Sequence, residues 1–200
     1  MLYYERKLIK KGYNLIIGVD EVGRGPLAGP VAAAAVTLKT VRFKNRIDDS
    51  KKLSRNQREQ AFGEIVNKSV FGIGLVNERI IDRVNIAVAT RMAMEQAISG
   101  LLNKLGDYHS KRIHILVDGN MHPQVGLPHT SIIKGDSKSK SIACASIVAK
   151  VIRDRIMDFY DKLYPQYGFI RHKGYLTQEH RSALKKFGPS SIHRLSFNGV

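Results

Sequence analysis

The sequence predicts an α/β domain with a mixed β-sheet, for three reasons. Short apolar runs of strand length alternate with longer segments in which apolar residues recur every three or four positions. The runs 14–19 and 31–38 are separated by GRGPLAGP, a Gly- and Pro-rich stretch that favours a turn between neighbouring strands. No internal repeat or flexible linker interrupts the chain, so its 200 residues, of which 43% are hydrophobic, fit one domain over residues 1–200. Strands and helices mixed in this order are typical of an α/β fold.

The middle of the chain supplies a helix, a strand, one or two further helices and another strand. Ser54 followed by Gln57 has the spacing of a helix capping box, and helically spaced apolar residues follow it. The runs 70–76 and 113–117 have the length and composition of buried strands. Helical spacing from Asn77 onward predicts one or two helices, with apolar positions at Ile80, Ile81, Val84, Val88, Met92, Ala93 and Ala97.

The last third of the chain is predicted to be mainly helical. The run 131–134 predicts a further strand. From Ser139 to Pro165 the apolar positions step by threes and fours, which predicts the longest helix of the chain. A short helix is expected over 177–187, within a C-terminal helical extension of about residues 165–200 that packs on the domain.

The strongly basic composition favours a polyanionic partner. Lys and Arg number 33 against 17 Asp and Glu, a formal net charge of +16. Such a field attracts nucleic acid by releasing its condensed counterions, although a basic enzyme unrelated to nucleic acid has the same composition. No strongly amphipathic basic helix stands apart from the core pattern, so no membrane partner is expected.

The sequence also favours a cytoplasmic protein. Cys144 is the only cysteine, so no internal disulfide can form and a reducing compartment is expected. Charged residues interrupt the N-terminal segment, which therefore does not resemble a signal peptide, and no apolar run approaches 18 residues. A monomer is expected because no apolar helix face is left over.

Acids at the ends of apolar runs are the first candidates for chemistry. They are Asp20, Glu21, Asp118 and Asp136. Acids at strand ends converge when the strands are neighbours in one sheet. Two carboxylates about 4 Å apart repel by on the order of 4 kcal/mol at an effective dielectric constant of 20, so the cluster demands protons or cations. Mg²⁺ and Mn²⁺ take oxygen ligands, and two such ions can hold the attacking water and the leaving oxygen of a phosphodiester.

Each acid also has an ordinary structural explanation. Asp118 precedes a glycine in a common turn pair, and Asp136 precedes the long helix, where an acid favours the N-terminus. Asp20 and Glu21 suit a solvated turn. Spacing alone leaves both interpretations open.

The glycines after Asp20 and Glu21 suggest a competing function. The stretch from Gly23 to Ala28 fits the loose dinucleotide-binding pattern G-x-G-x-x-A. A dinucleotide loop leads into a helix, however, whereas Pro30 interrupts the next segment here and two acids precede the loop. No G-K-S or G-K-T follows, which excludes a P-loop.

Histidines and cations outside the acid cluster are less informative. His180 and Arg181 could approach nucleic acid, but we expect a solvated helix face. The histidines show no zinc-ligand spacing, and we expect most to lie on the surface or in loops; they are His109, His114, His122, His129, His172, His180 and His193. A phosphate-binding patch and a solvated helix start are equally compatible with Lys51, Lys52, Arg55 and Arg58.

Several motifs together resemble bacterial ribonuclease HII. The signature GVDEVGRGPLAGPV spans 18–31, and further matches follow in family order: DSKKLS at 49–54, VDG at 117–119, KGDSKS at 134–139, SIVAKVIRD at 146–154, HKGY at 172–175 and FGPSSIHRLSF at 187–197. The resemblance covers nearly the whole chain. It favours the HII type over the related HIII type, which carries an extra N-terminal domain.

The resemblance implies a ribonuclease H-like fold, a mixed five-stranded sheet flanked by helices with a helical C-terminal segment. It implies hydrolysis on the 5′ side of a ribonucleotide in RNA–DNA hybrids or duplex DNA, leaving 3′-hydroxyl and 5′-phosphate ends, as part of ribonucleotide removal in replication and repair. Two Mn²⁺ or Mg²⁺ ions would be held, with substrate bound, by Asp20, Glu21, Asp118 and Asp136.

The resemblance also implies residues that recognise the substrate. The backbone of Gly23, Arg24 and Gly25 would recognise the 2′-hydroxyl, and Tyr175 would stack on the following deoxyribose. The positions that would face phosphates are Lys51, Ser137 and Lys138. This sequence departs from the family where Leu176 replaces a usual glycine and where Cys144 occupies a small-residue position. A broader two-metal nuclease or resolvase of this fold, and a catalytically silent nucleic-acid-binding protein, are the alternatives.

Overall fold

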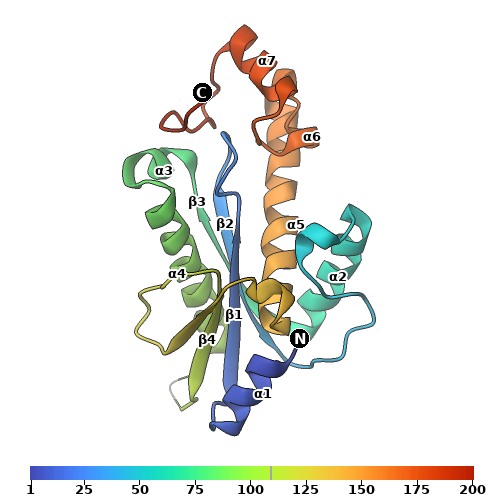
Figure 1. Ribbon diagram of the computed structural model, residues 1–200, viewed down its shortest axis with the longest axis vertical. Helices are drawn as coiled ribbons and strands as arrows, with labels where there is room; N and C mark the ends of the chain where they lie inside the picture. The colour runs from blue at the N-terminus through green and yellow to red at the C-terminus, as the bar shows by residue number, and fades with distance from the viewer. Residues whose placement is uncertain (109) are drawn as a thin grey trace.

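The computed structural model describes residues 1–108 and 110–200, and its centre is a mixed five-stranded sheet (Figure 1). The strand order is β3-β2-β1-β4-β5. β1 (Leu15–Val22) pairs antiparallel with β2 (Val31–Leu38), which pairs antiparallel with β3 (Ser69–Val76). β4 (Ile113–Asp118) runs parallel to β1, and β5 (His129–Ile132) runs parallel to β4. The predicted fold class is therefore confirmed.

Helices cover both faces of this sheet, as its largely apolar strands require. α3 (Glu78–Val84) and α4 (Ile86–Leu105) lie on one face, while α2 (Arg55–Lys68) and α5 (Lys140–Leu163) lie on the other (Figure 1). One apolar cluster fills the space between the sheet and α4, and a second fills the space between β2 and the pair α2 and α5.

Glycines let the helices approach the sheet closely. A Cβ on Gly74 would lie 1.9 Å from the carbonyl oxygen of Ala93 in α4, and a Cβ on Gly18 would lie 2.2 Å from the carbonyl carbon of Ser141 in α5. Neither side chain could be accommodated without moving a helix. α5 consequently lies directly against β1, the strand that ends in two candidate acids.

Several helix ends form as the sequence predicts. The hydroxyl of Ser54 accepts from the backbone N–H of Gln57, whose side chain accepts in return from the N–H of Ser54, so the capping box begins α2. The segment after Asn77 forms two helices, because Asn85 adopts a positive φ of 68° between α3 and α4. Thr177 caps α7 (Gln178–Phe187), which confirms the short C-terminal helix.

The C-terminal segment packs at the far end of α5 (Figure 1). It contains a 3₁₀ turn (Pro165–Tyr167), α6 (Phe169–His172) and α7. One apolar cluster joins these elements to the end of α5, and its buried members are Ala28, Met157, Tyr167, Phe169, Ala183 and Ile192. Because Ala28 lies between β1 and β2, the cluster also joins the C-terminal segment to the glycine-rich turn.

Two elements differ from the sequence prediction. α1 (Tyr3–Lys10) was not predicted; its Glu5 carboxylate accepts from the hydroxyl of Ser139 at 2.6 Å and from the backbone N–H of Ser141 at 3.0 Å. The strand predicted over 131–134 lies two residues earlier, at β5, because pairing with β4 sets its register. Asp136 therefore lies in a 3₁₀ turn (Gly135–Ser137) rather than at a strand end.

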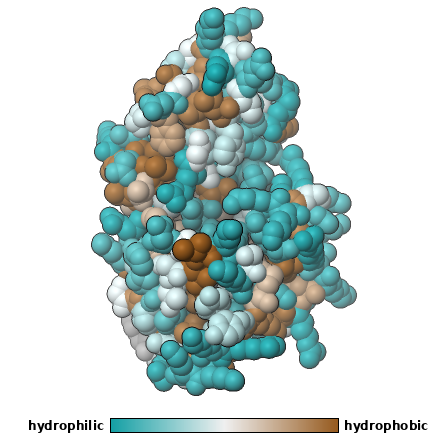
Figure 2. All heavy atoms as spheres, in the orientation of Figure 1, coloured by the Kyte–Doolittle hydropathy of each residue, from teal (hydrophilic) through white to brown (hydrophobic). Residues whose placement is uncertain are grey.

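The face seen in Figure 2 is largely hydrophilic, with apolar atoms in small separate groups. Among the described residues, no helix has both the length and the apolar character needed to cross a lipid bilayer. Cys144, at the small-residue position on α5, is buried.

Candidate active site

The four candidate acids meet at one end of the sheet. β1 and β4 are parallel neighbours in register, so Asp20 and Asp118 lie side by side, with Glu21 next along β1. Asp118 Oδ1 accepts a hydrogen bond of 2.6 Å from the backbone N–H of Gly135. This bond holds the turn that contains Asp136 against β4.

Burial and mutual repulsion raise the pKa values of three of these acids. Burial raises the pKa of Asp20 well above its usual value, and the charges of Glu21 and Asp118 raise it further. Burial is also the largest cause for Glu21 and Asp136, and Asp118 again adds to the increase in pKa. Arg24 opposes the increase for Glu21, and Lys51 opposes it for Asp136. The charge of Asp118 thus raises the pKa of all three neighbouring acids.

The acids fit hard divalent cations. Glu21 Oε2 is buried and accepts no hydrogen bond among the described residues, which leaves a carboxylate oxygen available to a ligand. A set of carboxylate oxygens suits Mg²⁺ or Mn²⁺ rather than a softer metal. Within the described part of the chain, no three acid, histidine or cysteine side chains are placed so that they could hold a metal ion by themselves. Mg²⁺ keeps several waters and uses substrate phosphates as ligands, so a site completed by substrate agrees with this geometry.

A groove of about 390 Å³ joins the acids to positive charge, and it is lined by Asp49, Lys51, Lys52, Asp118, Lys134, Asp136 and Ser137. Burial acts to lower the pKa of Lys51, but four acids outweigh it and raise this pKa: Asp49, Asp20, Asp136 and Asp118. The ammonium of Lys51 is therefore held in its charged form beside the cluster. Sequence reasoning did not single out Asp49 or Lys134 as lining residues.

The other predicted phosphate contacts divide into two groups. Lys51 and Ser137 line the groove, whereas the ammonium of exposed Lys138 donates to the carbonyl of Ile133 at 2.8 Å. Of the four cations near the start of α2, Lys51 and Lys52 line the groove. The other two are engaged within the protein: the guanidinium of Arg55 pairs with Asp158 at 2.6 Å, and that of Arg58 donates to the carbonyls of Ser50 and Leu53.

The glycine-rich loop and Tyr175 lie against each other. A Cβ on Gly25 would lie 3.7 Å from Tyr175 Cε1, an ordinary contact distance. The backbone N–H of Leu27 donates to the carbonyl of Gly174 at 2.8 Å, which joins the loop to the segment that carries Tyr175. Tyr175 is 44% exposed, and Arg24 reaches back to Glu21 at 3.4 Å. The structure therefore brings the predicted recognition residues together next to the acids.

Two buried arginines that sequence reasoning missed hold this loop. Arg153 in α5 donates to the carbonyls of Pro30, Ala28 and Lys173. Arg194 donates to the carbonyls of Gly23, Arg24 and Gly29. Both side chains are fully buried. The sequence signal was present, since both arginines lie inside quoted family motifs, but their spacing to the loop gave no hint of contact.

The expectation that most histidines lie on the surface or in loops fails for three that are buried in β4, α6 and α7, namely His114, His172 and His180. Buried histidines number four, namely His114, His172, His180 and His193, while His109 falls outside the described residues. His180, assigned from the sequence to a solvated helix face, is completely buried because α7 turns it towards Tyr167 and Phe169. Helical periodicity on a short amphipathic helix did not distinguish this buried polar position from an exposed one.

Two of these histidines form a hydrogen-bonded chain, and a third stacks on it. The backbone N–H of Ser190 donates to His193 Nδ1 at 2.9 Å, so His193 carries its hydrogen on Nε2 and donates to His180 Nε2 at 3.0 Å. His180 then donates from Nδ1 to the carbonyl of Tyr175 at 3.0 Å. His172 stacks on His180 with 4.5 Å between ring centroids. The chain requires neutral rings, and it supports the backbone of Tyr175.

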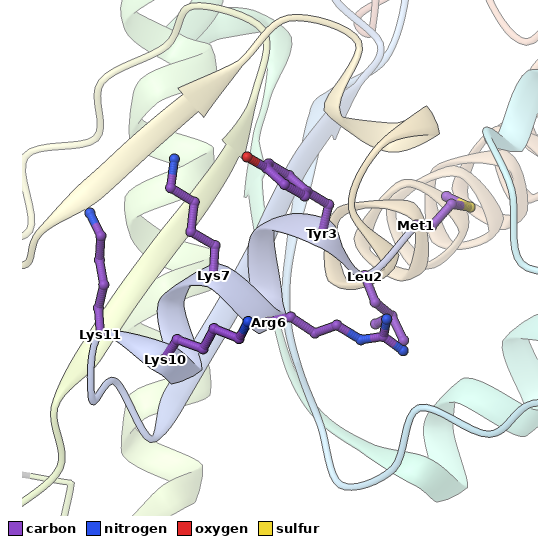
Figure 3. Close-up of a pocket in the computed structure, with 7 residues that line it drawn as sticks. All are labelled: Met1, Leu2, Tyr3, Arg6, Lys7, Lys10 and Lys11. Atoms are coloured by element: carbon purple, nitrogen blue, oxygen red, sulfur yellow. The ribbon is translucent and has the colours of Figure 1, made fainter.

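A larger hollow, of about 710 Å³, lies at α1, and none of the candidate acids lines it (Figure 3). Its lining residues are Met1, Leu2, Tyr3, Arg6, Lys7, Lys10 and Lys11. They supply cations and apolar surface but no carboxylate. The chemistry of the acid groove therefore makes that smaller groove the candidate active site.

The sheet and its covering helices define a ribonuclease H-like protein. The structure of RNase HII from Archaeoglobus fulgidus, in a complex with PCNA, superposes with a TM-score of 0.71 at 24% identity, over 92% of this chain and 95% of that one. The structure of Bst-RNase HIII in complex with Mn²⁺ superposes with a TM-score of 0.66 at 14% identity, over 92% of this chain and 67% of that one.

Residues 17–200 match the family model for Ribonuclease HII. Ribonuclease HII of Ruminiclostridium cellulolyticum is 52% identical over 198 residues, which is 98% of this chain and 75% of that relative. The chain belongs to the ribonuclease HII family. Membership supports ribonuclease H endonuclease activity on nucleic acid, with divalent metal ions.

Proposed function

We propose that the protein hydrolyses the phosphodiester on the 5′ side of a ribonucleotide, in RNA–DNA hybrids and in duplex DNA with embedded ribonucleotides. Water attacks phosphorus, the bond from phosphorus to the 3′-oxygen breaks, and the products are a 3′-hydroxyl and a 5′-phosphate. The observation that carries this proposal is that Arg24, which precedes Gly25 and its neighbour Tyr175, reaches Glu21 in the crowded acid cluster. The acid cluster supplies the chemistry, and the pair formed by Gly25 and Tyr175 supplies a place to recognise a ribonucleotide.

The acids would hold two divalent ions, Mn²⁺ or Mg²⁺, once substrate is bound. Their ligands would be Asp20, Glu21, Asp118 and Asp136. When bound, such ions supply an activated water and neutralise charge on the leaving oxygen. The repulsion that raises the pKa values of Asp20, Glu21 and Asp136 supports this assignment, because cations relieve it.

The remaining residues would bind and orient the nucleic acid. The backbone of Gly23, Arg24 and Gly25 would contact the 2′-hydroxyl, the group that separates RNA from DNA at a site. Tyr175 would stack on the following deoxyribose. Positively charged or polar side chains would contact phosphates, and these are Lys51, Ser137 and Lys138. Lys51 and Ser137 line the groove with two of the acids, which is consistent with a net charge of +16 that attracts the phosphate backbone.

The decisive experiment compares matched duplexes that carry zero, one or four ribonucleotides, incubated with Mg²⁺ or Mn²⁺. Cleavage of the ribonucleotide-containing strands, with 3′-hydroxyl and 5′-phosphate ends, is the expected result. An intact single-ribonucleotide duplex would contradict the proposal. The proportion cut with one and with four ribonucleotides measures the preference between embedded ribonucleotides and longer hybrids.

Two further measurements separate the alternatives. Cleavage of an all-DNA junction would favour a broader nuclease or resolvase of this fold. Divalent-ion binding that survives both Asp118→Asn and Asp136→Asn would favour a silent nucleic-acid-binding protein, because the acids would then not be the ion ligands. A single domain, a monomeric state, a cytoplasmic location and a role in replication and repair stay predictions from the sequence and family.

A further inference from the structure

Arg194 is an unusual cation because its partners are backbone carbonyls. Its guanidinium is completely buried and donates to Gly23 O at 2.7 Å, to Arg24 O at 3.0 Å and to Gly29 O at 2.7 and 2.9 Å. Within the described part of the chain, no carboxylate lies within 4.0 Å of it. Burial of a charged group costs free energy unless hydrogen bonds replace its water. Here the carbonyls of one short loop provide that replacement.

These bonds fix the direction in which the loop presents its amides. In a trans peptide the carbonyl of one residue and the N–H of the next point in opposite directions. With the carbonyls of Gly23 and Arg24 turned towards Arg194, the N–H groups of Arg24 and Gly25 point away from it. Both residues are exposed, and neither N–H has an acceptor among the described residues. The loop therefore offers two free parallel donors at the surface beside Tyr175.

Arg194 itself is held firmly. Its backbone N–H donates to the carbonyl of Leu27 at 2.8 Å, and its guanidinium lies over the Phe197 ring at 5.1 Å. Asp82 in α3 accepts from the backbone N–H groups of Leu195 and Ser196, both at 3.0 Å. The guanidinium is thus fixed relative to the core before any ligand is present.

We propose that Arg194 is a positioning residue that sets the discrimination between ribonucleotides and deoxyribonucleotides. It aims the N–H groups of Arg24 and Gly25 at the 2′-oxygen, whose two lone pairs can accept both. This inference rests on the proposed function of the same loop. Lysine cannot replace arginine here, because the ammonium places its donors on one atom, whereas the guanidinium fork reaches three carbonyls at once.

The test is an equilibrium binding measurement with Ca²⁺ in place of Mg²⁺, on two duplexes of identical sequence. One duplex is all DNA, and the other carries one ribonucleotide. The ratio of the two Kd values reports discrimination without cleavage. In Arg194→Lys we expect this ratio to fall at least tenfold, while the Kd for the all-DNA duplex changes less than twofold.

Ile192→Ala is the matched control. Ile192 is buried in the C-terminal apolar cluster two positions before Arg194, so the substitution destabilises the same segment without removing the guanidinium. It should lower the melting temperature and leave the Kd ratio within twofold of the wild-type value. A folded Arg194→Lys variant that keeps the wild-type ratio overturns the proposal.

A measurement on the wild-type protein covers the case in which Arg194→Lys does not fold. In amide NMR spectra, the Arg24 and Gly25 signals should differ between the complexes with the two duplexes. Identical signals in both complexes overturn the proposal as well. A wild-type Kd ratio near one, in contrast, contradicts ribonucleotide recognition by this loop altogether, and thus the proposed function itself.

Discussion

The acid groove and the recognition region, which comprises residues 23–30 and 172–175, lie on either side of the ion pair between Glu21 and Arg24 but are built on opposite principles. In and beside the groove, carboxyl groups crowd together, and one buried oxygen of Glu21 has no hydrogen-bond partner among the described residues. Around the recognition region, Arg153, Arg194, His172 and His180 are hydrogen-bonded to neighbouring backbone groups. The groups proposed for function therefore reduce the stability of the fold at the groove, whereas in the recognition region the groups that hold the loop also stabilise the fold.

The largest expected effect is in the groove. Asp20→Asn should slow cleavage of a single-ribonucleotide duplex on the order of 10³-fold, equivalent to about 4 kcal/mol, because it removes a proposed ion ligand. The same substitution should raise the free energy of unfolding by about 1 kcal/mol, because it removes a buried charge repelled by Glu21 and Asp118. Rate assays and urea unfolding at pH 7 without divalent ions measure the two effects.

Glu64→Gln is the contrasting control for Asp20→Asn. Burial acts to raise the pKa of Glu64, but its hydrogen bonds to Lys68, Asn45 and Lys44 outweigh it and lower this pKa to about 2. Removing this charge should reduce stability and leave cleavage unchanged. Wild-type activity in Asp20→Asn would contradict the assignment of Asp20 as an ion ligand and of the groove as the active site.

Two glycines of one loop should respond differently to alanine. Gly23 has a φ of +91°, and a Cβ there would lie 2.1 Å from Arg153 Nε, so Gly23→Ala should destabilise the fold by about 3 kcal/mol. Gly25 has room for a methyl group, so Gly25→Ala should keep the stability within about 1 kcal/mol. The methyl group would nevertheless cover the surface beside Tyr175 and slow cleavage. Equal unfolding midpoints for the two variants would remove the distinction.

The histidine chain predicts a loss of stability in acid. Burial lowers the pKa values of His172, His180 and His193, that of His193 to about 4. The unfolded histidine has a pKa near 6.5, so the unfolded state binds more protons between these values. The contribution of His193 is complete above about pH 6.5 and is lost as the pH falls towards 4, by up to about 3 kcal/mol at about 1.4 kcal/mol per pKa unit.

Urea unfolding at pH 7 and pH 5 measures this contribution. His193→Gln should flatten the pH dependence relative to the wild type, since one titrating ring is gone. His122→Gln, a change at a histidine whose hydrogen-bond partners among the described residues are His129 and Ser131, should leave the dependence unaltered. A wild-type dependence that persists in His193→Gln would show that other groups cause it.

The smallest expected effect concerns the exposed ring of Tyr175. Tyr175→Ala should slow cleavage about tenfold, the usual scale for loss of one aromatic stacking contact with nucleic acid. Tyr175→Phe should keep the wild-type rate, because the proposed stacking uses the ring and not the hydroxyl. Neither variant should shift the urea midpoint much, since the side chain is 44% exposed. A fully active Tyr175→Ala would remove this residue from the recognition region.

Local patterns predicted most of the fold, and long-range contacts decided the exceptions. The Ser54 capping box and the apolar steps after Ser139 depend on neighbours in sequence, and both helices form as predicted. α1 was missed because it depends on Glu5 bonding Ser139, 134 residues away. β5 was misplaced because Ile133, which the apolar run included, is 70% exposed.

The candidate site shows the same division. The acids follow apolar runs, so the sequence could suggest that they converge, and the family motifs named them. Arg153 and Arg194 could not be found in this way, because a buried arginine bound to carbonyls has no local signature. His180 and His193 could not be found from the sequence either, because the hydrogen bond between their rings forms only after α7 and the segment around His193 have packed together.

The bonds of Arg194 span 170 residues to Arg24 and 171 residues to Gly23. During synthesis, the chain up to residue 136 already contains every acid of the groove, yet the loop beside them still lacks the guanidinium that orients it. Contacts of such separation form late in folding, because a long stretch of chain must first be ordered. Nascent chains and early folding intermediates would therefore contain the acids of the groove before Arg194 orients the loop proposed to recognise the ribonucleotide. The contacts of the finished structure do not show this order, in which the acids are present before the loop is oriented.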